Sequence, residues 1–185
     1  MVFHSSEAID SGERIPIRLG PGLAFGSGEH ETTRSCLEEM ENIPVFSVAK
    51  VLDIGCGTGI LSIAAAKLGA RSVVALDPEP EAIEATINNI KLNRVEKKIS
   101  ILQGEVQMVR GERFNLIVAN LYGDVLLTLA SEIPPLLETG GYTLLSGIAF
   151  EYTYEVKTKL VKAGCELLKS MFLEEYCTLL FQKKA

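Results

Sequence analysis

The chain has no tryptophan, only two histidines and four widely spaced cysteines in 185 residues. No cysteine pair has the spacing of zinc ligands, and His4 and His30 are too few for a histidine-rich metal site, so we expect no metal. Reduced thiols of this kind are usual in the cytosol. The sequence also lacks an apolar run of the roughly 20 residues that span a bilayer, and residues 1–7 lack the basic head and apolar stretch of a signal peptide. These absences predict a cytoplasmic protein with no membrane contact.

Basic residues are in the minority, and the formal net charge is −6 with a sequence pI of about 5.1. An acidic chain binds phosphate backbones poorly, so we expect no direct nucleic-acid contact and favour a basic partner. A second interpretation, that mild acidity only keeps the chain soluble, stays open. Apolar residues make up 47% and charged residues 23%, as in ordinary globular proteins. With this length and no repeats, one domain is expected.

One stretch organises the rest of the sequence. An apolar run, 51–54, leads directly into Gly55, Gly57 and Gly59, and a helical pattern follows over 60–68. Such a run before a glycine turn is typical of a buried parallel strand, and glycines let the backbone pass close to a ligand. A strand, a glycine turn and a helix N-terminus together predict a site for a nucleotide-containing cofactor.

Strand-like and helix-like segments alternate from this point to the C-terminus. The expected strands cover 50–54, 72–76, 98–102, 114–119, 142–146, 166–172 and 175–182. The expected helices cover 32–42, 60–68, 80–92, 123–131 and 150–163. The last two strands are too close together for a parallel crossover, so they must form an antiparallel hairpin. We therefore predict a doubly wound α/β fold, with a mostly parallel seven-stranded sheet and helices on both faces.

Three local predictions concern the ends and faces of these elements. A short edge strand is expected within 15–19. Gly140 and Gly141 are expected to turn the chain into the strand at 142–146. The helix at 80–92 is expected to bury a stripe formed by Ala82, Ile83, Thr86, Ile87 and Ile90.

Three candidate binding residues follow three different strands. Gly55 follows the first, Asp77 ends the second, and Asn120 ends the fourth. Ligands of open parallel sheets lie beyond the carboxyl ends of the strands, so we expect these residues to line one site. A carboxylate at position 77 can accept both hydroxyls of a ribose. Asp77 and Asn120 each have a second interpretation as the cap of the following helix, and that alternative stays open.

The spacing of the glycines bears on the cofactor. They read Gly-x-Gly-x-Gly, so the third comes one position earlier than in the dinucleotide fingerprint. This spacing favours S-adenosylmethionine over NAD, because a compact turn leaves room for an amino-acid end where NAD places a pyrophosphate. Glu105, in the loop after the third strand, is a candidate partner of the adenine amine, and a solvated glutamate is the alternative.

Longer motifs resemble one family. Residues 22–33 resemble the loop that precedes the catalytic core of the PrmA family, with Ser27 in place of a threonine and Glu31 in place of a proline. The resemblance spans roughly residues 20–185. Further matching segments are 52–61, 67–70, 118–122 and 146–148.

The PrmA family methylates the large-subunit ribosomal protein numbered eleven, on its N-terminal amine and its lysine side chains. The resemblance implies a Rossmann-like class I methyltransferase fold that uses S-adenosyl-L-methionine and releases S-adenosyl-L-homocysteine. It also implies a basic acceptor protein, such as a ribosomal protein. By matched position it implies cofactor contacts from Thr33, Gly55, Asp77 and Asn120. The other candidates for the pocket are Phe25, which is alternatively a core aromatic, Gly57, Pro78 and Glu105.

Methyl transfer from a sulfonium is an in-line displacement, in which alignment of the reacting groups is the main task of an enzyme. We expect Asn120 to contribute to that alignment. An acceptor amine must first lose a proton; His30 and Glu29 are candidates for assisting this step, and solvent is the alternative. The glycine-rich loop 20–33 is expected to fold over the cofactor as a lid, with an inert surface loop as the alternative.

The expected organisation is a single domain over 1–185, with an N-terminal extension (1–20), the lid loop and a Rossmann-like core (45–185). Only about 20 residues stand where the family carries a domain that grips the substrate, and Tyr122 lies near the expected point of methyl transfer. The Asn-Pro-Pro-Tyr tetrad of enzymes that methylate adenine or glutamine is absent. Three alternatives therefore remain: a small-molecule methyltransferase, a nicotinamide-dependent oxidoreductase, and a non-catalytic cofactor-binding subunit.

Overall fold

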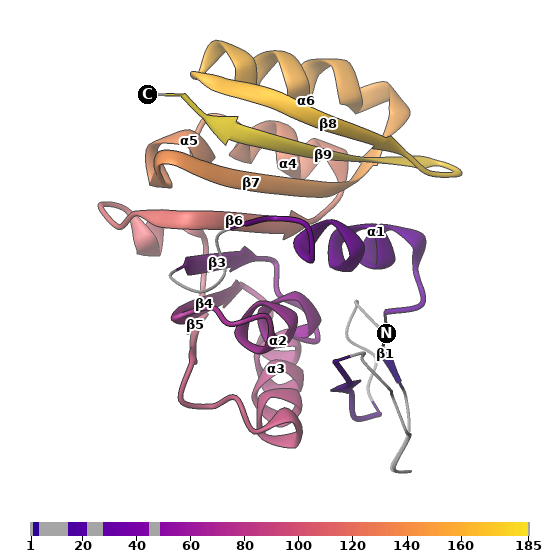
Figure 1. Cartoon of the computed structure of the whole chain (residues 1–185), viewed down its shortest axis with the longest axis vertical. Coiled ribbons are helices and arrows are strands. Elements are labelled where there is room, and N and C mark those ends of the chain that lie inside the picture. The colour runs from indigo at the N-terminus through magenta and orange to yellow at the C-terminus, as the bar shows by residue number, and fades with distance from the viewer. Residues whose placement is uncertain (1, 4–14, 22–27, 45–48, 185) are drawn as a thin grey trace.

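The computed structural model describes residues 2–3, 15–21, 28–44 and 49–184 (Figure 1). Its centre is a seven-stranded sheet in the order β5-β4-β3-β6-β7-β9-β8. The strands are β3 (Lys50–Ile54), β4 (Ser72–Asp77), β5 (Ile99–Gln103), β6 (Phe114–Asn120), β7 (Leu137–Ala149), β8 (Cys165–Phe172) and β9 (Tyr176–Lys183). Neighbours are parallel except that β9 runs antiparallel to β7 and β8. The predicted mostly parallel sheet with an antiparallel C-terminal hairpin is confirmed.

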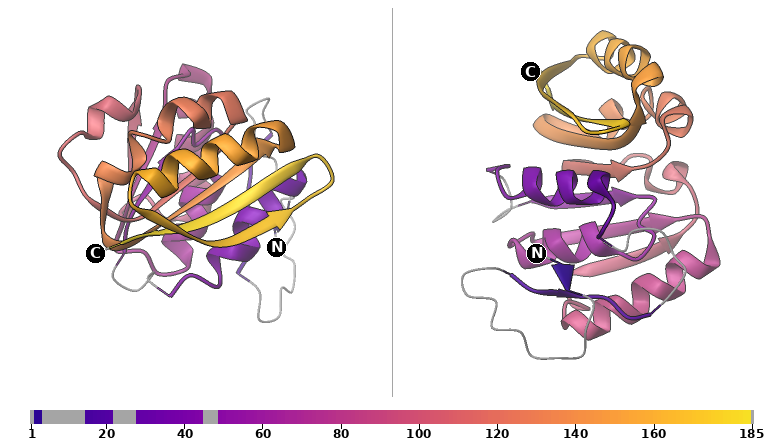
Figure 2. Two further views of the ribbon diagram at one scale, coloured as in Figure 1. Left: turned by 90° about the horizontal axis from the view of Figure 1, so that it is seen from above. Right: turned by 90° about the vertical axis from the view of Figure 1, so that its right-hand side faces the viewer.

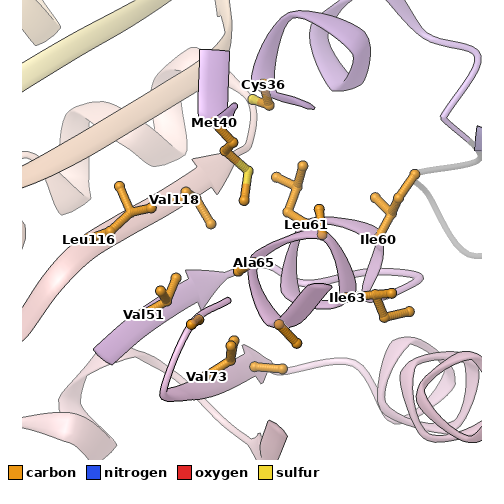
Figure 3. Close-up of a cluster of buried hydrophobic side chains, with 14 of the residues drawn as sticks. Cys36, Met40, Val51, Ile60, Leu61, Ile63, Ala65, Val73, Leu116 and Val118 are labelled. Carbon is orange, nitrogen blue, oxygen red and sulfur yellow. The ribbon is translucent and has the colours of Figure 1, made fainter. Parts of the chain in front are cut away.

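Helices cover both faces of this sheet and divide the apolar core in two. They are α1 (Glu31–Met40), α2 (Ile60–Lys67), α3 (Pro80–Asn93), α4 (Gly123–Leu129), α5 (Ile133–Leu136) and α6 (Phe150–Lys162). One cluster joins α1, α2 and α3 around Met40 and Ile63 (Figure 3). The other joins α4, α5 and α6 around Leu126 and Phe181. Strand β6 supplies alternate residues to both clusters, as expected of a central strand buried on both faces.

One predicted detail of β7 is wrong, and two short elements were not predicted. Gly140 and Gly141 do not turn the chain into a strand but lie inside β7, which begins at Leu137. The register with β6 is interrupted there, and Gly140 has a positive φ of 76°, so the two glycines form an irregularity within the strand. The short helix α5 and a 3₁₀ turn over Val106–Val109 were not expected either.

The buried stripe of α3 also differs from the prediction. Ala82, Thr86 and Ile90 are buried as expected, whereas Ile83 and Ile87 are only half-buried. The buried face of α3 instead includes two asparagines, Asn89 and Asn93. An asparagine can be buried at low cost when its amide satisfies backbone groups, and both asparagines do so.

Asn93 fixes the N-terminal segment against α3. Its Oδ1 accepts the N–H of Arg18 at 3.0 Å and its Nδ2 donates to the carbonyl of Arg18 at 2.6 Å. Arg18 belongs to β2 (Ile17–Arg18), within the predicted edge strand, and β2 pairs in parallel with β1 (Val2–Phe3) in a separate two-stranded sheet. Asn89 extends this attachment, because its Oδ1 accepts the N–H of Gly20 at 2.8 Å.

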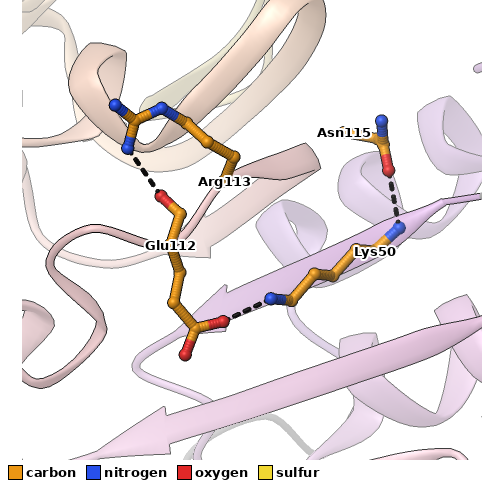
Figure 4. A network of polar contacts seen from close by, with 4 residues as sticks. All are labelled: Lys50, Glu112, Arg113 and Asn115. Carbon is orange, nitrogen blue, oxygen red and sulfur yellow. Dashed lines mark hydrogen bonds and ion pairs between the residues drawn. The ribbon is translucent and has the colours of Figure 1, made fainter.

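A polar network joins the amino ends of β3 and β6, away from the predicted site (Figure 4). The N–H of Lys50 donates to Asn115 Oδ1 at 2.8 Å, and the Lys50 ammonium pairs with Glu112. Arg113 donates to the Glu112 carbonyl at 2.9 Å. The partly exposed ion pair contributes little stability, but the backbone bond to Asn115 sets the alignment of the two strands.

Within the part of the chain that the structure describes, no helix has the length and apolar character to cross a bilayer.

Candidate functional site

The glycine turn after β3 presents backbone at the carboxyl edge of the sheet. Gly55, Gly57 and Gly59 have φ of 72°, 54° and 78°, where other L residues are strained. The N–H groups of Gly55 and Cys56 donate to the carbonyl of Leu76, at 2.8 and 3.1 Å, and so tie the turn to β4. The turn therefore holds a fixed shape with little side-chain cover from its own residues.

Side chains of α3 support the turn from behind. Thr86 Oγ1 donates to the Gly57 carbonyl at 2.9 Å, and Asn89 Nδ2 donates to the Thr58 carbonyl at 2.8 Å. A Cβ at Gly59 would lie 3.0 Å from the Thr86 side chain. The stripe predicted for α3 included Thr86 as a core residue and did not include Asn89. The available signal was a pair of polar residues within an otherwise apolar helical stripe.

Asp77 joins the end of β4 to the glycine turn. Its side chain is buried, with Oδ2 accepting the Gly57 N–H at 2.9 Å and Oδ1 accepting the Glu79 N–H at 3.0 Å. Glu79, not Asp77, occupies the N-cap position of α3, so the capping interpretation of Asp77 is wrong. A carboxylate has about four lone-pair positions, so Asp77 can still accept hydroxyl donors from a ligand.

Asn120 lies at the end of β6 and is half-buried. Its Nδ2 donates to Thr33 Oγ1 at 3.2 Å, while Tyr122 occupies the N-cap position of α4. The capping interpretation of Asn120 is therefore wrong as well. Thr33 itself is fully buried behind Asn120, and its neighbour Thr32 reaches the cavity wall instead.

Gly147 brings β7 close to the segment that follows β6. Its φ is +80°, and a Cβ there would lie 2.5 Å from the Leu121 carbonyl oxygen. The N–H of Leu121 donates to the carbonyl of Ser146 at 3.1 Å. The family resemblance included 146–148 without a role, and the structure shows that Gly147 permits this approach beside Asn120.

Two cavities meet over this edge of the sheet. The smaller has a volume of about 180 Å³, and the larger about 730 Å³. Four residues line both: Gly55, Asp77, Leu121 and Tyr122. The Leu121 side chain lies over Gly55, where a Cβ would overlap it. The cavities are thus two lobes of one site that share the glycine turn and the Asp77 carboxylate.

The predicted site residues are distributed over both lobes. The smaller lobe is lined by Gly55, Gly57, Asp77, Asn120 and His30. Pro78 and Glu105 are exposed and line the larger lobe. Thr33 lies behind the wall, and Phe25 falls outside the described residues. Glu29 is exposed and lines neither lobe. The tertiary structure therefore brings seven of the ten candidates to one site, and their roles stay predictions.

His30 begins α1 at the mouth of the smaller lobe. As the N-cap, its Nδ1 accepts the Thr32 N–H at 3.4 Å and lies 2.8 Å from Thr32 Oγ1. Its ring packs edge-on to Tyr176, with centroids 5.4 Å apart. Nδ1 therefore serves the cap of α1.

Buried ionisable groups surround the turn. Burial, reinforced by the Asp53 carboxylate, raises the pKa of the Cys56 thiol far above its usual value. Burial also raises the pKa of the Cys36 thiol to about 12, so neither thiol is a nucleophile at neutral pH. Burial raises the pKa of Asp53 to about 6 despite a hydrogen bond from Ser62 at 2.6 Å. Among the described residues, no set of three His, Cys, Asp or Glu side chains is placed to hold a metal ion.

The strand order, the antiparallel β9 and the site at the carboxyl edge define the class I methyltransferase fold. A solved methyltransferase from Pyrococcus furiosus shares this fold, with a TM-score of 0.69 and 20% identity over 83% of this chain and 82% of that one. The chain belongs to the ribosomal protein L11 methyltransferase (PrmA) family, whose profile matches residues 1–184. The resemblance predicted from the motifs is confirmed.

Individual relatives support this assignment. The ribosomal protein L11 methyltransferase of Thermoanaerobacter sp. (strain X514) is 39% identical over 178 residues, which are 96% of this chain and 57% of that protein. The chain thus spans little more than half the length of this curated relative. The structure of a ribosomal protein L11 methylase from Lactobacillus delbrueckii subsp. bulgaricus has a TM-score of 0.89 and 31% identity, over 98% of this chain and 92% of that one.

Proposed function

We propose that this chain transfers a methyl group from S-adenosylmethionine to an amine nitrogen of a protein, with ribosomal protein L11 as the first acceptor to test. Family membership supports methyl transfer, and the names of the relatives supply the acceptor. The observation that carries the proposal is the placement of Gly55 and Asp77 on the wall shared by both lobes. A ligand with two unlike ends joined by a ribose fits that arrangement.

The residues present fit S-adenosylmethionine. Pro78 and Glu105 would hold the adenine in the larger lobe, Asp77 would accept the ribose hydroxyls, and the backbone at Gly55 and Gly57 would face the methionine end. When bound, the cofactor supplies a methyl group already activated by the sulfonium.

Charge favours this cofactor over a dinucleotide. The described walls of the larger lobe include no Lys or Arg. They include five acidic residues: Asp77, Glu79, Glu105, Asp124 and Glu132. A pyrophosphate beside these carboxylates would be repelled, whereas the uncharged adenosine that the proposal places in this lobe would not. This supports a methyl donor and disfavours the nicotinamide-dependent alternative.

The side chains of the smaller lobe are suited to positioning an amine. Because the amide N–H of Asn120 donates to Thr33, its Oδ1 is available to accept from an acceptor amine and orient the nitrogen lone pair. The raised pKa of Cys56 supports direct transfer without a cysteine intermediate. Alignment of the reacting groups therefore supplies most of the rate enhancement, and water takes the amine proton at the open mouth beside His30.

Three earlier expectations stay predictions. They are the lid role of 20–33, the division of the chain into extension, lid and core, and a cytoplasmic location.

The proposal is tested with tritiated S-adenosylmethionine, purified L11 and a small-molecule extract separated by a filter. Label in L11 that disappears with Asp77→Ala, but not with Glu138→Ala at the opposite edge, supports the proposal. Label only in the small-molecule fraction favours the small-molecule alternative. Calorimetric titrations with S-adenosylhomocysteine and NADH complete the test. Saturable NADH binding without S-adenosylhomocysteine binding would overturn the proposal, and S-adenosylhomocysteine binding without any labelling would indicate a non-catalytic subunit.

A further inference from the structure

Charge is unevenly distributed between the two edges of the sheet. The segments at the carboxyl edge hold half of the 24 acidic residues and none of the 18 Lys and Arg. These segments are 28–33, 55–60, 77–84, 103–109, 120–129, 146–156 and 171–178. In Figure 1 this edge lies on the right, where the β8–β9 turn and the start of α6 project, and the right panel of Figure 2 looks onto it. Four cations border these segments: Arg34, Arg110, Lys157 and Lys169. Arg110 pairs with Glu132 and Lys169 pairs with Glu39.

A built contact fixes part of this acidity in place. The turn between β8 and β9 carries Glu174 and Glu175, both exposed. The carboxylate of Glu31 accepts their backbone N–H groups, at 3.0 and 3.4 Å. The turn that carries Glu174 and Glu175 is thus held against a third acidic residue, and Arg34 and Lys169 line the hollow on the other side of Glu31. Like charges gathered at one corner repel one another. A cationic partner would relieve that repulsion.

Exposed aromatic side chains lie beside the acidic turn. Phe172 is 68% and Phe150 48% exposed, and their rings pair with centroids 6.1 Å apart. Tyr154, one helical turn after Phe150, is 78% exposed. Large aromatic side chains that are exposed together are typical of a surface that binds a partner.

This aromatic surface continues into the smaller lobe of the site. Tyr176 lines that lobe and pairs across β7 and β9 with Ala149, the residue before Phe150. Cys177, the next residue, pairs with Phe172. A polypeptide lying over the aromatic pair therefore passes the mouth of the lobe, where an amine would be methylated.

Resting on the proposed function, we propose that Phe150, Tyr154, Phe172, Glu174 and Glu175 form a docking surface for a lysine-rich segment of the acceptor polypeptide. The glutamates attract the ammonium groups, and the rings contact both the alkyl stems of the lysines and, through cation–π attraction, their charges. Nucleic acids and anionic lipid surfaces would be repelled by the same face.

The test compares two variants with matched controls. The first variant combines Glu174→Gln with Glu175→Gln and removes two charges from the docking surface. Its control combines Glu138→Gln with Glu166→Gln and removes two exposed charges from the opposite edge. Phe172→Ala truncates an exposed ring, and Leu168→Ala truncates an exposed residue of the same strand. The backbone contacts of Glu31 survive all of these changes. Each protein is assayed for methyl transfer to L11, for S-adenosylhomocysteine affinity, and for binding of a fluorescent octalysine peptide.

We expect both surface variants to raise KM for L11 and Kd for octalysine about 3- to 10-fold at low salt, with kcat changed less than about twofold. For the glutamate variant only, the increase in KM and Kd over the unsubstituted protein should become smaller as NaCl rises from about 50 mM to about 500 mM. KM and Kd within about twofold of the unsubstituted protein would overturn the docking surface. If L11 is never labelled but octalysine binding depends on Glu174 and Glu175, the surface stands and the proposed methyl transfer fails.

Discussion

The side-chain amide of Asn120 donates a hydrogen bond to the buried hydroxyl of Thr33 at 3.2 Å and thereby joins β6 to α1. The two residues are 87 positions apart in the sequence. Asn120 lines the smaller lobe, so Thr33 acts on the site through the orientation of its neighbour.

Thr33→Val keeps the size of the side chain and removes the acceptor of the Asn120 amide. We expect kcat for methyl transfer to fall roughly tenfold, with stability lowered by about 1 kcal/mol and S-adenosylhomocysteine affinity nearly unchanged. Steady-state kinetics and calorimetry measure these effects, with Thr139→Val, an exposed site on β7, as the control. An unchanged kcat in Thr33→Val would show that the bond does not orient Asn120 for transfer.

Asp77→Asn preserves shape but replaces one acceptor oxygen by an amide that cannot accept the N–H of Gly57 or Glu79. Hydrogen bonds to a charged group contribute about 1.5–3 kcal/mol, so S-adenosylhomocysteine affinity should fall roughly tenfold to a hundredfold. Isothermal titration calorimetry checks this, with Glu138→Gln as the control. Affinity equal to that of the unsubstituted protein would mean that the carboxylate only shapes the turn.

Asp53→Asn should alter the pH dependence of stability. The folded-state pKa of about 6 lies above the ordinary value of 3.8 for this carboxyl, so the protonated form contributes stability below about pH 4 that is lost as pH rises through about 6. At one pKa unit per 1.36 kcal/mol, the charged carboxylate costs on the order of 3 kcal/mol at neutral pH. The variant should therefore gain stability relative to the unsubstituted protein as pH rises from 4 to 7.5.

Urea unfolding at several pH values measures this difference, and Glu166→Gln, an exposed carboxylate, serves as the control. A free-energy difference between Asp53→Asn and the unsubstituted protein that stays constant across this pH range would contradict the assignment.

A comparison of Gly147→Ala with Gly140→Ala distinguishes the cost of a positive φ from the cost of a close contact with the Leu121 backbone. Both glycines have positive φ, +80° and +76°, but a Cβ meets the Leu121 carbonyl only at Gly147 and meets nothing within 4 Å at Gly140. The backbone conformation alone costs an L residue about 1–2 kcal/mol. We expect Gly140→Ala to lose about that much in urea unfolding and to keep its ligand affinity. Gly147→Ala should lose more and bind S-adenosylhomocysteine more weakly, because the Asn120–Leu121 segment must move. Equal effects of the two substitutions would exclude a role for the close approach.

Sequence patterns predicted the strands and helices because their signals are local. A mostly apolar run before a glycine turn, such as 51–54, is typical of a buried strand between covered faces. The three-residue gap between β8 and β9 permits only a hairpin. Gly55 and Asp77 were also found in this way, since the ends of parallel strands necessarily share an edge. The faces of α3 were predicted less well. Burial of Asn89 depends on backbone acceptors 31 residues away at Thr58, which no periodicity within the helix reveals.

The amino-acid sequence by itself determined the order of elements, the glycine turn and the acid that follows the next strand, because hydrophobic periodicity and glycine conformation act over neighbouring residues. Only the tertiary structure decided that Thr33 lies behind Asn120, that Gly147 admits the Leu121 backbone, and that Phe150 meets Phe172 beside an acidic turn. Those relationships depend on contacts between distant segments, and such contacts exist only once the sheet has brought the strand ends together.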